Sequence, residues 1–361
     1  HKLDHLQFAD KARRGTEDAT LSLVNVIVQH LQHSTASASV LFIDFSSAFN
    51  TMQTHILLQR LIDLSVNGSF IHWVRDFLCE RPQRVFLNGT WSQEIVLNTG
   101  APQGCVLSPL LFSIYTDEMK VQNAVVSLYK YADGMALVGL LFKEQSVCQQ
   151  LYFDQVLALQ DWCTSSSLQI NVSKTKELVF DTTKNSADSF QPIVVNGEQV
   201  EVVECFKCLG THIDNKLTFQ QNTDFIFKKA MQRLFLLRKL RSFGVSEHIL
   251  ENVYKSLIQS LLSFNITVWF GNLSVKNRGK LARVVNLASK IIGRPQDQLG
   301  EVYKVSVRKK AFAITADTSH PLHCHFEKLP SGRRFRVPLC RKNLFKKSFL
   351  PSAISMLNAD S

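Results

Sequence analysis

The sequence predicts an α+β fold, in which a small antiparallel sheet with flanking helices precedes a helical region. Short apolar runs such as Val40–Ile43 and Met135–Leu141 are typical of buried strands. From Phe225 onward, apolar residues recur at helical spacing. A chain of 361 residues allows two or three domains. Since no apolar run reaches the roughly 18 residues of a membrane-spanning helix, no such helix is expected.

The first part of the chain alternates helical and strand-like patterns. The apolar run Val40–Ile43 ends at Asp44, which predicts a buried strand with an acid at its end. Val85–Trp91 predicts a hairpin that turns at Asn88-Gly89. Three helices are predicted in this part, over residues 20–31, 56–64 and 70–78.

A second group of elements surrounds another acid. Ser108 as N-cap and Pro109 at the first helical position predict a helix through about Met119. The apolar runs Val125–Tyr131 and Met135–Leu141 predict a hairpin with Asp133 in its tip. Further elements are a helix over 151–163, strands at 178–180 and up to about 217, a polar loop over 182–192, and helices from 225, after 246 and over 275–292.

The charge is distributed unevenly along the chain. Residues 1–225 contain 16 Lys+Arg and 23 Asp+Glu, whereas residues 226–361 contain 25 and 7. Such a basic second half favours a polyanionic partner. A solvated basic face and an acidic membrane surface are the alternatives on charge alone.

The chain contains eight scattered cysteines and begins with neither Met nor a signal pattern. We therefore expect reduced thiols, an intracellular location in the nucleus or cytoplasm, and a chain that is a fragment of something longer. The pair Cys205 and Cys208 lacks two further ligands at zinc-site spacing, so chance is the better explanation of it.

Asp44 stands at the end of one predicted strand, and Asp133 stands in the turn between two others. Two carboxylates brought together from separate strands suit Mg²⁺, which takes a few carboxylates together with substrate phosphates. Taken alone the signal is weak, because acids at strand ends are commonly only solvated termini.

The order of the blocks is more specific. Three blocks follow one another along the chain: Phe42–Phe49, Gly100–Gly104 with Ser108-Pro109, and Tyr131-Ala132-Asp133. In this order they resemble the reverse transcriptase family, and more narrowly the polymerase of LINE-type (non-LTR) retrotransposons. Further blocks resemble the same family in the same order: Gln7–Ala9 with Arg14–Ala19, Asn171 with Lys174–Lys176, Phe206–Gly210, Trp269–Asn272 and Leu329–Arg334.

The resemblance implies a right-hand polymerase palm followed by a helical thumb. It implies partial fingers over 1–39, a palm over 40–217, a thumb over 218–294 and a basic C-terminal tail over 295–361. The implied reaction is attack of a DNA primer's 3′-hydroxyl on a dNTP, directed by an RNA template, with two Mg²⁺ ions.

Site residues follow from the same resemblance. Asp44, Asp133 and the Phe45 carbonyl would bind metal, and Lys174 or Lys176 would protonate the departing pyrophosphate. Phe49 would favour deoxynucleotides. Gln103, Gly104 and Arg14 would contact nucleotide or template. The cations expected to follow the primer–template backbone are Lys228, Lys229, Arg233, Arg238, Lys239 and Arg241.

Three positions depart from the family pattern. Gly134 stands where the family has the second aspartate of Tyr-Ala-Asp-Asp, Asn50 where an acid is frequent, and Cys208 where an aromatic residue is usual. The missing carboxylate predicts reduced or lost polymerase activity. The rival interpretation is a non-catalytic nucleic-acid-binding remnant of the same fold. A basic membrane-surface protein is a third alternative, without the amphipathic helix that it needs.

Overall fold

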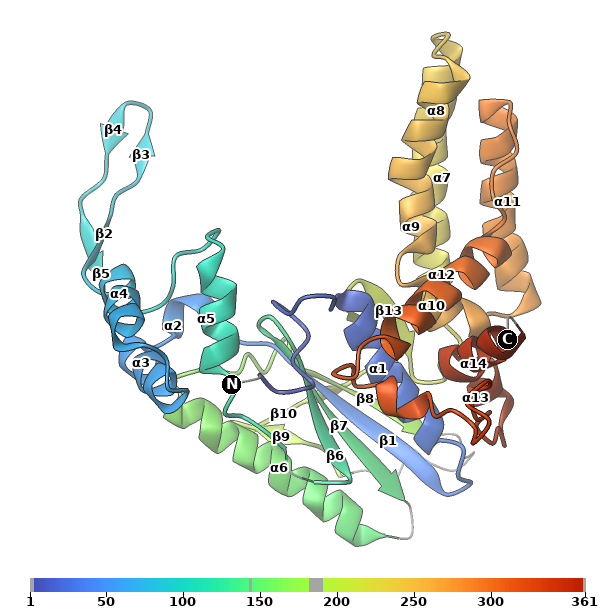
Figure 1. The fold of residues 1–361 in the computed structure, drawn as a ribbon. Helices are drawn as coiled ribbons and strands as arrows, with labels where there is room; N and C mark the ends of the chain where they lie inside the picture. Colours follow the sequence, from blue (N-terminus) through green and yellow to red (C-terminus); the bar gives the residue numbers. More distant parts are fainter. Residues whose placement is uncertain (1–2, 122, 143–144, 182–190, 360–361) are drawn as a thin grey trace. The chain divides into compact units, whose positions relative to one another are not determined.

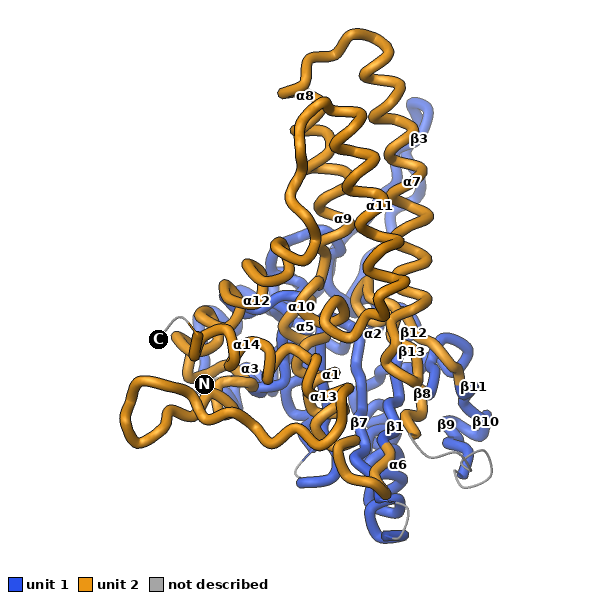
Figure 2. Tube along the Cα trace, turned by 90° about the vertical axis from the view of Figure 1, so that its right-hand side faces the viewer, with its two compact units in different colours: residues 1–15, 38–177, 185–202 blue, residues 16–37, 178–184, 203–361 orange. Residues whose placement is uncertain are grey.

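The computed structural model describes residues 3–121, 123–142, 145–181 and 191–359, which divide into two compact units (Figure 2). Unit 1 comprises residues 1–15, 38–177 and 185–202, and unit 2 comprises residues 16–37, 178–184 and 203–361. Within the described residues, no helix combines the length and apolarity needed to cross a membrane. Each unit is made of several separate segments of the chain. The predicted fingers, palm, thumb and tail are continuous segments, so they are a different kind of division and remain a prediction.

A five-stranded sheet has the strand order β11-β8-β1-β7-β6. Strands β6 and β7 pair antiparallel, as predicted, whereas β11 and β8 form a parallel pair at one edge, which the sequence pattern did not indicate. The predicted apolar runs correspond to strands of this sheet, whose bounds are β1 (Ala36–Ile43), β6 (Val126–Tyr131), β7 (Gly134–Phe142), β8 (Lys176–Asp181) and β11 (Glu201–Val202).

Five helices belong to unit 1, and the longest of them, α6, runs along the sheet (Figure 1). The contact between α6 and β7 is close because Gly139 lacks a side chain: a Cβ there would lie 2.6 Å from the ring of Tyr152. This contact belongs to the large apolar core of unit 1. The helices are α2 (Ala48–Thr51), α3 (Thr54–Asp63), α4 (Gly68–Leu78), α5 (Leu107–Tyr115) and α6 (Ser146–Ser165).

Three short antiparallel pairs complete unit 1. The predicted hairpin is confirmed: Asn88 and Gly89 form its turn, and both have positive φ, as a type I′ hairpin turn requires. The bounds are β2 (Arg81–Gln83) with β5 (Ile95–Leu97), β3 (Phe86–Leu87) with β4 (Thr90–Trp91), and β9 (Val194–Val195) with β10 (Glu198–Gln199). The predicted loop at 182–192 lies mostly outside the described residues.

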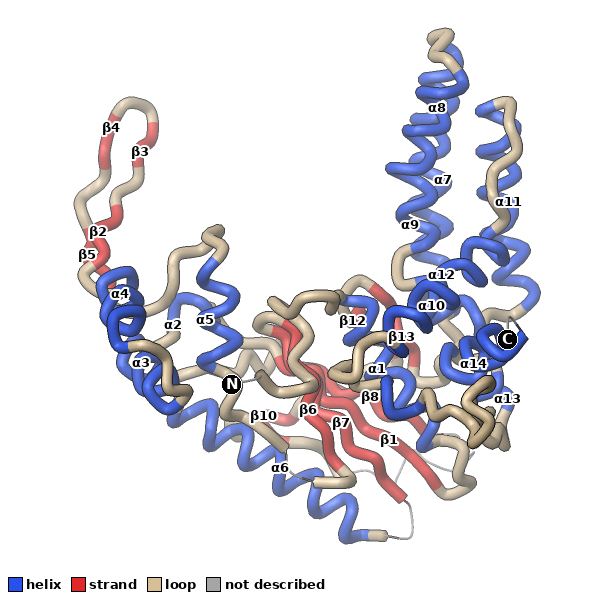
Figure 3. Tube along the Cα trace, viewed as in Figure 1, coloured by secondary structure: helices blue, strands red, loops and turns tan. Residues whose placement is uncertain are grey.

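Unit 2 is mainly helical (Figure 3). The structure confirms the predicted helix over 275–292, which ends at Gly293 with φ of 90°. Segment 295–361, expected as a tail, contains two further long helices. The elements of unit 2 are α1 (Thr16–His30), β12 (Cys205–Cys208), β13 (Thr211–Asp214), α7 (Gln220–Ser242), α8 (Glu247–Tyr254), a π-helix (Lys255–Gln259), α9 (Ser260–Ser263), α10 (Ile266–Trp269), α11 (Val275–Ile292), α12 (Leu299–Thr315), α13 (Asn343–Lys346) and α14 (Phe349–Ala359).

Helix α1 packs in unit 2 through buried charges. Asp18, 4% exposed, lies 2.8 Å from the Lys310 ammonium and 3.3 Å from Nε2 of His320. The carboxylates of Asp18 and Glu17 raise the pKa of Lys310, although burial alone would lower it. A buried carboxylate needs such partners. This cluster therefore ties the N-terminal helix to the C-terminal part of the chain.

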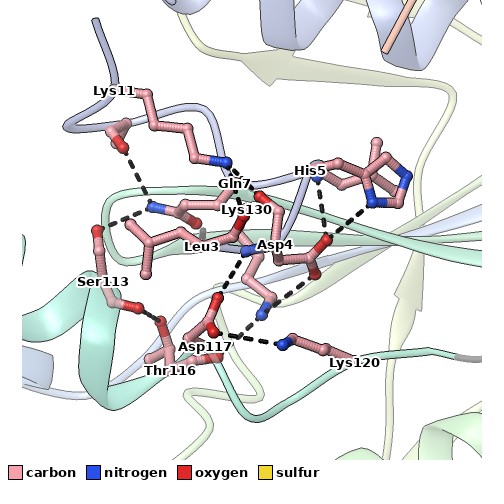
Figure 4. Close-up of polar contacts among 12 residues, drawn as sticks. Leu3, Asp4, His5, Gln7, Lys11, Ser113, Thr116, Asp117, Lys120 and Lys130 are labelled. Atoms are coloured by element: carbon pink, nitrogen blue, oxygen red, sulfur yellow. Dashed lines mark hydrogen bonds and ion pairs between the residues drawn. The ribbon is translucent and has the colours of Figure 1, made fainter. Parts of the chain in front are cut away.

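In unit 1, the N-terminal segment is attached to β6 around a buried lysine (Figure 4). Lys130 is 1% exposed, and its ammonium donates to the Thr116 carbonyl at 2.9 Å and lies 3.7 Å from Asp4. The backbone of Lys130 also bonds to Leu6 and Phe8. Burial lowers the pKa of Lys130 to about 8, against the opposing pull of Asp4 and Asp117. The segment thus extends the sheet beside the strand that leads to Asp133.

Acidification is expected to destabilise unit 1 through Asp4. Burial would raise the pKa of Asp4, but hydrogen bonds from His5 and the Leu6 N–H, and the Lys130 charge, lower it to about 2. Its stabilising contribution is therefore complete above the unfolded-state value of 3.8 and is lost as the pH falls toward 2. The shift corresponds to about 2 kcal/mol of unfolding free energy.

Urea unfolding at about pH 5 and about pH 2.5, in the chain and in Asp4→Asn, measures this contribution. The variant should lose less stability between the two pH values. Equal losses would contradict the assignment.

Candidate functional site

Asp44 follows β1 directly, and the chain on both sides of it is held by segment 169–175. Its carbonyl accepts from the Asn171 N–H at 2.8 Å, and its N–H donates to Oγ1 of Thr175 at 3.3 Å. The Ser46 N–H donates to the Gln169 carbonyl at 2.8 Å. The backbone that presents the Asp44 carboxylate is therefore fixed.

The Phe45 carbonyl points away from this segment. Phe45 forms an antiparallel bridge with Ile170, but the flanking hydrogen bonds use the Asp44 carbonyl and the Ser46 N–H. In antiparallel pairing, the backbone groups of successive residues alternate in direction. The Phe45 carbonyl is thus directed to the opposite side of its segment.

Asp133 occupies the tip of the β6–β7 hairpin. Tyr131 pairs with Gly134, which leaves a two-residue turn of Ala132 and Asp133, and Ala132 has φ of 53°. The left-handed region is uncommon for alanine, but hairpin turns of this length require it. The turn leaves the Asp133 side chain exposed.

The two aspartates belong to neighbouring strands. Figure 1 shows β1 and β7 side by side and running in opposite directions, so β1 ends at the same end of the sheet as the β6–β7 turn. Oδ2 of Asp44 is enclosed and has no hydrogen-bond partner among the described residues. Within the same residues, no group of three or more His, Cys, Asp or Glu side chains could hold a metal ion.

The loop at 100–104 is fixed against the residues that follow Asp44. The Gly100 N–H donates to the Met52 carbonyl at 2.7 Å, and the Ala101 N–H donates to Phe49 at 2.8 Å. A Cβ on Gly100, whose φ is 72°, would lie 2.6 Å from the Phe49 carbonyl oxygen. Only glycine permits this approach.

The same loop brings Gln103 to Asn50. Nε2 of Gln103 donates to Oδ1 of Asn50 at 3.2 Å, and Phe49 packs on Phe112 of α5 with ring centroids 5.0 Å apart. Gly104 has φ of 82° with open space beside it. The structure therefore brings the loop that contains Gln103 and Gly104 against Phe49 and Asn50, which come from a separate motif.

The predicted start of the helix after this loop was wrong. Helix α5 begins at Leu107, so Ser108 is an internal residue rather than the N-cap. Its hydroxyl donates back to the Pro102 carbonyl at 2.6 Å and bonds the Cys105 thiol. Burial would raise the pKa of Cys105, but the Ser108 contacts lower it. Ser108 therefore closes the loop instead of beginning the helix.

Sequence reasoning missed Arg81. Its guanidinium donates to the carbonyls of Thr99 and Gly100 at 2.7 and 3.0 Å. A cavity of 480 Å³ is lined by Arg81 and Asn50 together with Gln83, Leu97, Thr99 and the loop residues 100–103. The sequence gives no sign that Arg81 binds this loop, because its acceptors are backbone carbonyls and every residue type has one.

The two lysines left as alternatives have different surroundings. Nζ of Lys174 lies 3.6 Å from Oδ2 of Asp44, whereas Lys176 lies 2.6 Å from the Glu201 carboxylate on β11. The Arg14 guanidinium donates to the Arg13 carbonyl at 3.4 Å.

The predicted cations of α7 do not share one face. Lys228 and Lys239 are exposed on the same stripe as Phe235, which is 66% exposed. Arg233 turns to the Leu257 carbonyl of the π-helix. By helical spacing, Lys229 lies on the side of Arg233 and Arg241 on another side, whereas Arg238 is exposed next to Phe235. Fewer of the predicted cations therefore share the exposed stripe with Phe235 than the sequence predicted.

Comparison with known families gives a match that covers all of unit 1 and part of unit 2. The family described as "Reverse transcriptase (RNA-dependent DNA polymerase)" matches residues 1–213. A shorter match, to the N-terminal part of alkylated DNA repair protein alkB homolog 8, covers only residues 219–260.

Curated relatives come from insect mobile elements. The chain is 27% identical over 281 residues to the RNA-directed DNA polymerase from mobile element jockey of Drosophila melanogaster, which covers 73% of this chain and 29% of the relative. It is 25% identical over 301 residues to the probable RNA-directed DNA polymerase from transposon BS of the same species, over 80% of this chain and 32% of the relative. The chain thus spans about a third of the length of these relatives.

A solved structure of telomerase from Candida albicans, in complex with a fragment of telomeric RNA, is also similar. The match has a TM-score of 0.38 and 12% identity, and it covers 88% of this chain and 54% of the telomerase chain.

The approach of Gly100 to α2 can be tested by adding one methyl group. Gly100→Ala is expected to lower the free energy of unfolding by about 3 kcal/mol, because both the positive φ and the backbone contact resist a Cβ. Gly104→Ala has the same φ penalty without the contact, so we expect a loss of about 1 kcal/mol. Urea unfolding of both variants measures the difference, and equal losses would show that the close approach is not required.

Proposed function

We propose that this chain, which belongs to the reverse transcriptase (RNA-dependent DNA polymerase) family, forms the palm and thumb of a LINE-type retroelement polymerase whose metal site is weakened by Gly134. RNA template, DNA primer and dNTP are its proposed partners. One observation carries the proposal: β1, which leads to Asp44, ends beside the β6–β7 turn, which contains Asp133. The loop 100–104 is hydrogen-bonded to the residues that follow Asp44.

The donor set fits Mg²⁺. Oδ2 of Asp44 accepts no hydrogen bond among the described residues, although the Lys174 ammonium lies 3.6 Å from it, and the Phe45 carbonyl points away from its neighbouring segment. Mg²⁺ is commonly held by one or two carboxylates together with substrate phosphates, so Asp44, Asp133 and the Phe45 carbonyl suffice as protein ligands. When bound, Mg²⁺ favours ionisation of the attacking hydroxyl and offsets the charge of the phosphates.

The other residues of unit 1 bind and orient the nucleotide in this proposal. The Phe49 ring, packed on Phe112, is the steric gate at the sugar. Gln103 and the backbone at Gly104 form the side of the site that faces the base pair, and the hydrogen bond with Asn50 orients the Gln103 amide. The adjoining cavity of 480 Å³ lies in the size range of small-ligand sites.

Lys174 is the proposed proton donor. Its ammonium lies 3.6 Å from Asp44 and is exposed, so it can reach a leaving pyrophosphate, whereas Lys176 is held by Glu201. A positioned acid typically contributes about 10²- to 10⁴-fold to a rate.

Gly134 also favours a second candidate function, namely a non-catalytic nucleic-acid-binding remnant. It removes one carboxylate from the turn that should carry two. In that case the exposed lysine stripe of α7 would retain salt-dependent binding to nucleic acid.

Restoring the carboxylate tests the two candidates. Gly134 has no left-handed φ, and a Cβ there would meet only the Tyr131 carbonyl oxygen at 3.4 Å, so Gly134→Asp should fold normally. We expect RNA-templated extension of a DNA primer to rise by about 10- to 100-fold, because a metal contact stabilises the transition state by a few kcal/mol. Asp133→Asn in the Gly134→Asp background is the control that should abolish extension. No extension by any of these chains would favour the binding-only function.

The lysine assignment is tested in the same Gly134→Asp background. Lys174→Gln is expected to slow single-turnover extension by about 10²-fold, with little change in dNTP affinity. Lys176→Gln, which removes the pair with Glu201, is the matched control and should stay near the parent rate. The reverse order of effects would assign the proton donor to Lys176.

A further inference from the structure

A cavity of 630 Å³ lies within unit 2, at the base of two long helices. Its lining includes two lysines and no acidic side chain. The nearby Asp214 carboxylate accepts from the backbone of Thr218 and Phe219, and so serves the turn before α7. The lining residues are Lys216, Leu217, Thr218, Gln220, Asn272, Leu273, Ser274, Asn277, Asn343, Leu344 and Lys347.

Helices α7 and α11 both begin at this cavity. Nδ2 of Asn277 donates to Oε1 of Gln220 at 2.8 Å, and one turn further along both helices Lys280 pairs with Asp224. The two helices therefore run parallel, and their positive dipole ends lie together. Helix N-termini favour anions, and the cavity has two of them beside Lys216 and Lys347. The first N–H groups are partly satisfied, since the Asn277 N–H donates to the Ser274 hydroxyl at 3.2 Å and the Gln220 N–H to the Thr218 hydroxyl at 3.3 Å.

Gly271 allows the wall of the cavity to close. A Cβ on Gly271 would lie 2.1 Å from the Lys347 carbonyl oxygen, so only glycine lets the segment at 343–347 reach this position. The neighbouring Asn272 and the residues Asn343 and Lys347 then face one cavity. This contact gives a physical role to the Trp269–Asn272 block.

Two side-chain amides at the cavity each have one buried atom without a hydrogen-bond partner among the described residues. Asn277 is 2% exposed, and while its Nδ2 is bonded, its Oδ1 accepts nothing. Nδ2 of Asn272 is enclosed and donates to nothing. Leaving a buried donor or acceptor unpaired is energetically costly. A ligand that satisfies both must carry a hydrogen-bond donor as well as an acceptor, and a hydroxyl beside a phosphate supplies the two together.

We propose that this cavity binds a ribose-phosphate unit of an RNA strand. The phosphate lies at the lysines and helix N-termini and accepts from Asn272, and the 2′-hydroxyl donates to Oδ1 of Asn277. A deoxyribose would leave Asn277 unpaired, so the cavity distinguishes RNA from DNA. The inference deepens the proposed function, since it rests on RNA being a partner of the chain, but it uses no residue of the proposed metal site.

Fluorescence anisotropy with single-stranded RNA and DNA oligonucleotides of one sequence, without Mg²⁺ or dNTP, tests this proposal. The chain should prefer RNA. Asn277→Ala and Asn272→Ala should each reduce the RNA/DNA affinity ratio by about fivefold, as loss of one hydrogen bond predicts. Asn272 makes no contact with α7 among the described hydrogen bonds, so its variant keeps the helix pair even if Asn277→Ala fails to fold. Asn286→Ala, on the same helix but away from the cavity, is the matched control.

The charged part is tested separately with Lys216→Gln/Lys347→Gln. This variant should weaken binding of both nucleic acids and reduce the slope of log affinity against log salt by about 1. An RNA/DNA ratio unaffected by Asn272→Ala overturns the ribose site, even if the lysine variant weakens binding. An unchanged salt slope overturns the phosphate site.

Failure of the proposed polymerase function has a different signature. In that case Gly134→Asp extends no primer, while the RNA preference and its loss in Asn272→Ala are retained.

Discussion

The approach of Gly100 to the backbone of Phe49 and Asn50 is the contact on which the candidate nucleotide site depends. Residues from separate motifs meet there only because one position has no side chain. The hydrogen bonds from Gly100 and Ala101 then fix the loop, and the bond between Gln103 and Asn50 uses a geometry that this backbone contact sets. The Arg81 guanidinium also holds this loop, since it donates to the carbonyls of Thr99 and Gly100. The site is therefore positioned by backbone contacts more than by side-chain packing.

The hairpin that carries Asp133 is stabilised next to its turn. Its two-residue turn requires a left-handed alanine, which is a local cost of roughly 1 kcal/mol or more. Immediately before the turn, β6 pairs with the N-terminal segment and encloses the Lys130 ammonium. A buried ammonium must keep its partners, so it holds the Thr116 carbonyl and Asp4 at fixed places. The exposed aspartate is thus supported by buried polar contacts on the strand leading to it.

Sequence reasoning succeeded where a local pattern decides the structure. The hairpins at Asn88-Gly89 and at Asp133, and the helix that stops before Gly293, follow from turn chemistry and periodicity over a few residues. It did not find Arg81, the buried Lys130 or the parallel β8–β11 pair, because their partners are distant in sequence. Ser108 has the residue type of an N-cap, but the Pro102 carbonyl offers its hydroxyl a tertiary acceptor, and the helix begins earlier. The predicted metal and nucleotide roles came from the order of motifs, not from any single residue.

The position of Gly134 separates the chemistry of this chain from its fold. Its backbone conformation suits any residue, and its surroundings leave room for a side chain, so glycine there satisfies no structural requirement. Gly100 and Gly271 are the opposite case, since each allows a backbone approach that a Cβ would prevent. A carboxylate at 134 can therefore be absent without any compensating change in packing, and selection on the fold alone would not restore it. The surfaces that contact nucleic acid in the proposals, on α7 and at the base of α7 and α11, depend on contacts that do not include this position.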